Sequence, residues 1–178
     1  MTPVEQLAAW IAEEKAVAER LDAGPGPGLA RPDQIVGKTG LEMMQAMLRA
    51  EIPYAPIAKT LSFQLIEVGP GRAVFQGTPR PEHLNPLGTI HGGWFATLLD
   101  SALGCAVHTT MPAGRAYTTA ELGVNLVKAL TPRVERVRAE GKVIHCGRQL
   151  ATAEARLVGP DGTLYAHATT TCLVFEMR

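Results

Sequence analysis

A run of apolar and small residues in the middle of the chain constrains the fold most. The segment from His91 to Thr109 has no proline and only one glycine after Gly93, so its pattern predicts an uninterrupted helix. A helix that is apolar on all sides is expected to be buried on all sides. Asp100 lies in the middle of this run, where a buried carboxylate is costly unless it is paired or has a chemical task. We therefore take Asp100 as the first candidate functional residue.

The first third of the chain reads as helical. Apolar residues at helical spacing predict an amphipathic helix over residues 3–22, and a Gly-Pro-rich linker follows at residues 24–28. A second short helix is predicted over residues 41–50, with Thr39 and Glu42 at the spacing of a capping box. We call residues 1–56 the N-terminal arm and expect them to be accessory to a main domain at residues 57–178. The pattern leaves open whether this arm stays on its own subunit or covers a neighbour.

The period of the apolar residues changes from helical to alternating after the arm. Alternation predicts a half-buried strand at residues 61–65, and residues 73–78 are expected to pair back with it. Further strands are predicted at residues 119–126, 136–143, 150–157 and 164–175, with small Ala and Gly residues on their inner faces. The expected fold class is therefore α+β, a curved antiparallel β-sheet wrapped around one long central helix, with an N-terminal helical extension.

Composition excludes several kinds of partner and site. The 17 basic and 17 acidic residues cancel, so we expect no nucleic-acid partner. The sequence offers neither a membrane span nor a signal peptide, and we expect a cytoplasmic protein with its three cysteines reduced and buried. Neither the histidines nor the cysteines show metal-ligand spacing, so no metal site is predicted.

Three motifs give the chain a resemblance. They are Asn-Pro-x-Gly-x-x-His-Gly-Gly at residues 85–93, Leu-Leu-Asp at residues 98–100, and a Thr-Thr pair at residues 118–119. In this combination the chain resembles the hot-dog-fold acyl-CoA thioesterases, most of all the phenylacetate-degradation-type (PaaI-like) family, over roughly residues 57–176. One departure is the Val-Lys-Ala sequence at residues 127–129, where many relatives have Leu-Arg-Pro.

The resemblance implies a role for each motif residue. The Gly92 N–H polarises the thioester carbonyl, Asn85 helps to position it, and His91 holds the loop by hydrogen bonding. Asp100 acts as general base or nucleophile, and Thr119 orients the water. The implied substrate is an acyl-CoA, no cofactor is needed, and the expected assembly is a homodimer or a dimer of dimers. Backbone N–H groups at a helix N-terminus also suit an oxyanion on general grounds.

The spacing of two of these residues bears on the assembly. Gly92 and Asp100 are eight residues apart, which is roughly 12 Å along a helix at ~1.5 Å per residue. An oxyanion donor and a base that serve one carbonyl must both lie within ~3 Å of the reacting atoms. Two antiparallel central helices around a twofold axis would bring Asp100 of one subunit to Gly92 of the other.

Several alternatives stay open at this point. Another hot-dog enzyme acting on acyl thioesters, such as a hydratase or dehydratase, and a non-catalytic acyl-CoA-binding module are competing functions. Thr118 competes with Thr119 for the water-orienting role, since alternation places Thr118 on the helix-facing side and Thr119 on the opposite side. A basic cluster that includes Arg136 and Arg138 could contact CoA phosphates, although a solvated strand edge is the favoured interpretation.

Overall fold

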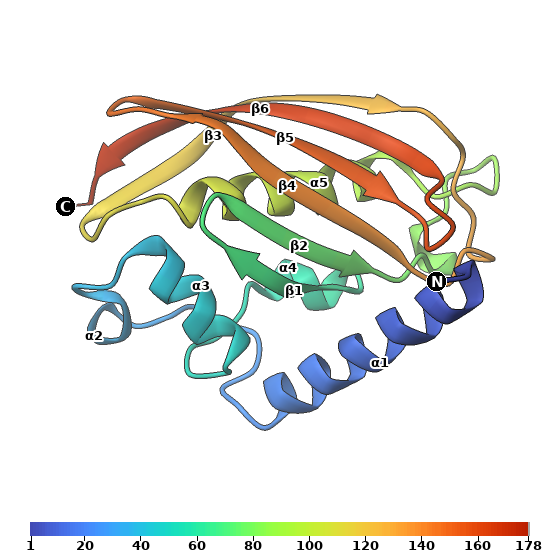
Figure 1. Cartoon of the computed structure of the whole chain (residues 1–178), viewed down its shortest axis with the longest axis horizontal. Helices are drawn as coiled ribbons and strands as arrows, with labels where there is room; N and C mark the ends of the chain where they lie inside the picture. Colours follow the sequence, from blue (N-terminus) through green and yellow to red (C-terminus); the bar gives the residue numbers. More distant parts are fainter. Residues whose placement is uncertain (178) are drawn as a thin grey trace.

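A curved antiparallel sheet wraps around one long helix in the computed structural model, which describes residues 1–177 (Figure 1). The sheet has six strands in the order β1-β2-β4-β5-β6-β3. The strands are β1 (Phe63–Gly69), β2 (Arg72–Gly77), β3 (Arg115–Leu126), β4 (Val137–Cys146), β5 (Leu150–Val158) and β6 (Leu164–Glu176). The central helix is α5 (Gly92–His108). The predicted fold class is confirmed.

The side of α5 that faces the sheet forms the centre of the core. Leu98, Leu99 and Leu103 are fully buried there. Gly141 of β4 lies so close to the helix that a Cβ on it would sit 2.3 Å from the Ala102 carbonyl oxygen. The small inner-face residues thus let the sheet approach the helix backbone, as the strand patterns predicted.

The expectation that α5 is buried on all sides is wrong. Asp100, Ser101, Cys105 and His108 form a stripe along the helix that is only partly buried. The sheet covers the helix from one side, and on the other side a cavity lies beside part of this stripe. Asp100 is therefore a half-buried carboxylate at a cavity wall, which lowers the cost of its charge.

Four helices precede the sheet. They are α1 (Pro3–Asp22), α2 (Pro32–Ile35), α3 (Gly40–Leu48) and α4 (Pro56–Thr60). The two predicted helices of the N-terminal arm are confirmed as α1 and α3, and each begins with the capping box that satisfies its first N–H groups, built by Thr2 and Thr39. The strand predicted at residues 61–65 begins only at Phe63, because a turn at residues 61–62 follows α4. The short helices α2 and α4 were missed.

The arm packs on the sheet of its own chain (Figure 1). Arg136 pairs with Glu14, and Arg138 pairs with Glu13 at 2.6 Å, while the Arg138 guanidinium stacks over the Trp10 ring at 4.6 Å. The expectation of a solvated strand edge is therefore wrong for these arginines. Their charges are neutralised by α1, which also shields them from other anions.

Two further properties concern the chain as a whole. The three cysteines are free, but Cys146 is exposed and Cys105 is only partly buried, so the expectation that all three are buried holds for Cys172 alone. Over the described residues, each helix is too short or too polar to cross a membrane.

Candidate functional site

The N-terminus of α5 presents backbone N–H groups at the surface. His91 is the N-cap residue, and its Nδ1 accepts a hydrogen bond from the Gly93 N–H at 2.9 Å. The Trp94 N–H donates to the His91 carbonyl at 2.9 Å. Within residues 1–177, the Gly92 N–H has no hydrogen-bond partner. Because the positive end of the helix dipole lies here as well, this N–H can hold an oxygen that gains negative charge.

Asn85 organises the loop that leads into α5. Its Oδ1 accepts hydrogen bonds from the N–H groups of Leu87 at 2.9 Å and Thr89 at 3.3 Å. Its Nδ2 donates to Thr89 Oγ1 at 2.9 Å. The side chain thus fixes the turn between residues 85 and 89, and its role toward a substrate carbonyl stays a prediction.

His83 packs against the first turn of α5 and holds the same loop in place. Its ring is buried and stacks on the Trp94 ring, with 5.6 Å between centroids and 26° between planes. Burial lowers the pKa of His83, which favours the neutral form of the ring in this packing. Its backbone carbonyl accepts the His91 N–H at 2.8 Å, which ties the loop to the start of α5.

Asp100 and Thr119 meet in the middle of the helix. Thr119 Oγ1 donates a hydrogen bond to Asp100 Oδ1 at 3.0 Å. A hydroxyl has a single proton, so Thr119 can only accept a hydrogen bond from a further group, such as a water. The second carboxylate oxygen of Asp100 has no hydrogen-bond partner among residues 1–177. This pair can therefore orient and deprotonate a water molecule.

A β-bulge places Thr119 toward the helix. Strand β3 loses its register with β6 between Thr119 and Glu121, so the inner face passes from Tyr117 and Thr119 to Leu122. Strict alternation had put Thr119 on the side away from the helix, and that expectation is wrong. Thr118 is exposed instead.

The predicted site residues fall into two groups in one chain. Asn85, His91 and Gly92 lie at the N-terminus of α5, and Asp100 and Thr119 lie two turns further along. At ~1.5 Å per residue the two groups are roughly 12 Å apart along the helix. A single chain does not bring them to one reacting carbonyl.

A largely apolar cavity of about 240 Å³ opens beside Asp100. Its walls come from α4, α5, the strands β1 to β3 and the N-terminal arm, which contributes Met47, Leu48 and Tyr54. Gly104 lies one turn after Asp100. A Cβ at this position would lie 2.8 Å from the Tyr117 hydroxyl oxygen, so glycine leaves room for the tyrosine. The motifs did not indicate this cavity. The sequence signal that could have indicated the cavity is Gly104, a small residue four positions after Asp100.

The other ionisable groups beside the cavity are neutral. Burial raises the pKa of the Cys105 thiol to about 12, so this residue is not an activated nucleophile. Burial also raises the pKa of Tyr117 well above its usual value. Residues 1–177 contain no cluster of three or more His, Cys, Asp or Glu side chains that could hold a metal ion. Asp100 is thus the group at this wall suited to act as base or nucleophile.

The sequence and the fold are both similar to those of known proteins. The model of the Thioesterase superfamily matches residues 87–166, which include most of the motif at residues 85–93, all of α5 and Thr119. A solved structure of a protein from Thermus thermophilus is 30% identical, with a TM-score of 0.61, and the alignment covers 67% of this chain and 97% of that one.

Two further relatives extend the comparison. A mutant of the phenylacetic acid degradation protein PaaI, also from Thermus thermophilus, is 29% identical with a TM-score of 0.60, covering 66% of this chain and 97% of that one. A curated protein of Halobacterium salinarum, proposed to be an esterase, is 35% identical over 82 residues. That match covers 46% of this chain and 54% of the relative, so the chain spans about half the length of this curated relative.

Proposed function

This chain belongs to the thioesterase superfamily, with the hot-dog fold of the PaaI-like proteins, and we propose that it is an acyl-CoA thioesterase that works as a dimer with two shared sites. One observation carries the proposal most directly. Thr119 holds Asp100 by a 3.0 Å hydrogen bond at the wall of an apolar cavity, while the Gly92 N–H stands free at the far end of the same helix.

The proposed reaction uses each of these groups once. Asp100 takes a proton from a water held at Thr119, and the water oxygen attacks the thioester carbonyl carbon. The carbonyl oxygen becomes an oxyanion that accepts a hydrogen bond from Gly92 of the partner subunit. The C–S bond then breaks, and the CoA sulfur takes the proton from Asp100. In the alternative, an Asp100 oxygen attacks the carbonyl carbon itself, and the C–S bond breaks as CoA leaves as the thiolate. Water then hydrolyses the resulting anhydride to the free acid and the Asp100 carboxylate, and the proton released goes to the thiolate.

The role of Thr119 can be tested by removing only its hydroxyl. Thr119→Val keeps the shape of the side chain but loses the hydrogen bond to Asp100. Hydrogen bonds to charged groups contribute about 1.5–3 kcal/mol, so kcat/KM should fall by about 10- to 100-fold. Thr118→Val is the matched control, because Thr118 is exposed on the same strand. Equal losses in the two variants, measured by thiol release from acyl-CoA, would contradict the assignment.

The shared site can be tested by complementation between two inactive variants. Gly92→Pro removes one N–H, and proline suits the first position of a helix. Each of Gly92→Pro and Asp100→Asn should alone lower thiol release by about 100-fold or more. A heterodimer of the two, purified through two different tags, has one site in which both residues are native. We expect about half of the wild-type activity per dimer.

The complementation experiment has a clear opposite outcome. If Asp100 and Gly92 of the same chain served one site, the heterodimer would stay as inactive as the parent variants. A wild-type protein that is monomeric by light scattering and fully active would refute the shared site as well. The predicted cytoplasmic location and the choice between dimer and dimer of dimers stay predictions.

A further inference from the structure

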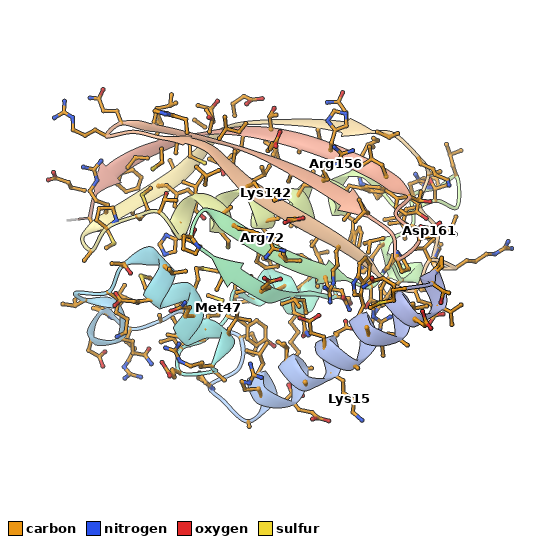
Figure 2. All side chains as sticks on the ribbon, in the orientation of Figure 1. Lys15, Met47, Arg72, Lys142, Arg156 and Asp161 are labelled. Atoms are coloured by element: carbon orange, nitrogen blue, oxygen red, sulfur yellow. The ribbon has the colours of Figure 1, made fainter. Side chains whose placement is uncertain are left out.

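The N-terminal arm contributes directly to the cavity beside Asp100, although it lies outside residues 87–166, the part that matches the thioesterase superfamily. Met47, labelled in Figure 2, lies on α3, and Met47, Leu48 and Tyr54 line the same cavity as Asp100. We propose that the arm closes the acyl pocket of this enzyme and limits it to uncharged, apolar acyl groups of medium size. This inference rests on the proposed thioesterase function.

The wall that the arm builds is held in a fixed position. The Gly40 N–H at the start of α3 donates to the Met111 carbonyl at 2.9 Å. A Cβ on Gly40 would lie 1.8 Å from the His108 carbonyl oxygen, so α3 rests directly on the backbone at the end of α5. At the other end of α3, the Arg20 side chain of α1 donates to the Leu48 carbonyl at 3.1 Å. With both ends fixed, α3 cannot move away without breaking these contacts.

The lining of the cavity determines the chemical class of the acyl group. Among the described residues that line it there is no Lys, Arg or His, and Asp100 is the one charged group. Two polar groups of the lining already donate to backbone carbonyls, Ser101 Oγ to Thr97 and Gln64 Nε2 to Glu14. If an acyl group carried a free carboxylate at its far end, that charge would be buried in the cavity close to Asp100, with no cation to pair with it. Such substrates should be rejected.

The volume of the cavity sets an approximate size. A dry apolar cavity of about 150 Å³ holds a six-carbon ring, benzene. In proportion, the 240 Å³ beside Asp100 would hold about eight to ten carbon atoms. Both a straight chain and a ring with a short linker would fit. Larger acyl groups would have to displace Met47 or Leu48, which are packed against the core.

The inference can be tested by changing the volume of the wall at Met47. Thiol release is measured for straight-chain acyl-CoAs of two to twelve carbons and for adipoyl-CoA, which carries a terminal carboxylate. For the wild type we expect the highest kcat/KM near eight carbons and a value at least about 100-fold lower for adipoyl-CoA than for hexanoyl-CoA. Met47→Trp should lower kcat/KM for octanoyl-CoA about tenfold or more and change butyryl-CoA hydrolysis much less. Met47→Ala should shift the optimum to longer chains.

A control and a second readout keep this result separate from the thioesterase proposal. Met43→Ala changes the same helix one turn earlier, at a residue that does not line the cavity, and should leave the chain-length profile unchanged. Active enzyme with the same profile in both Met47 variants would overturn the inference and leave the proposed function standing. If no acyl-CoA is hydrolysed, the proposed function fails. Calorimetric titration with octanoyl-CoA then decides the inference, which is overturned if Met47→Trp binds as tightly as wild type and supported if it binds more weakly.

Discussion

Asp100→Asn is expected to lower kcat/KM for acyl-CoA hydrolysis by about 10²- to 10⁴-fold. The amide cannot accept a proton from water at neutral pH, and it cannot attack a carbonyl carbon as a carboxylate does, so the loss is expected under either role of Asp100. The amide still has an oxygen that can accept the Thr119 hydroxyl at the position of Oδ1. The local geometry should therefore survive, and thiol release from octanoyl-CoA measures the loss of chemistry.

The control for this variant is an aspartate that has no part in the site. Asp33 is exposed on α2 and pairs with Arg31, so Asp33→Asn should change kcat/KM by less than about twofold. The thermal unfolding midpoint of Asp100→Asn should stay near the wild-type value, because Asp100 is only partly buried and keeps one hydrogen bond. An Asp100→Asn protein that is folded and as active as wild type would contradict both proposed roles of this residue.

Local signals predicted the three longest helices of this fold, α1, α3 and α5. Thr39 and Glu42 form the capping box at the start of α3 that their spacing indicated, and the proline-free run of apolar residues becomes α5. These features depend on residues within a few positions of each other, where propensity and capping act. The burial of α5 was misjudged because it depends on which neighbours cover each side, and composition does not contain that information.

The face of Thr119 could not be predicted from alternation. A β-bulge inserts one residue into a strand and reverses the inside and outside positions after it, without any fixed sequence marker. The motif that resembles the PaaI-like family favoured Thr119, whereas alternation favoured Thr118 as the residue facing the helix. The hydrogen bond from Thr119 to Asp100 agrees with the motif, although its catalytic role is untested.

The cavity was not predictable from the motifs because its walls come from segments that are far apart in the sequence. Met47 lies in the arm, and Asp100 and Tyr117 lie in α5 and β3. Met47 has an ordinary local setting, since an apolar residue on a short helix next to a core is typical of simple packing. The division of the chain into residues 1–56 and 57–178 stays a prediction, but the arm supplies part of the wall of the cavity that Asp100 also lines.

The close approach of sheet and helix that positions Asp100 makes a strong prediction for Gly141. Gly141→Ala places a Cβ 2.3 Å from the Ala102 carbonyl oxygen and 2.9 Å from the Leu103 nitrogen, both of which are helix backbone. Overpacking in a core lowers the free energy of unfolding by about 1–3 kcal/mol. Because helix backbone cannot rotate away as a side chain can, we expect a loss of about 3 kcal/mol or more for Gly141→Ala. The unfolding midpoint should fall by about 10 °C in calorimetry.

Gly69→Ala is the control, because nothing lies within 4 Å of its Cβ position, and it should shift the midpoint by less than about 3 °C. If both variants unfolded at the wild-type temperature, α5 would not rest on β4 at Gly141, and the packing that holds Asp100 at the cavity wall would be different.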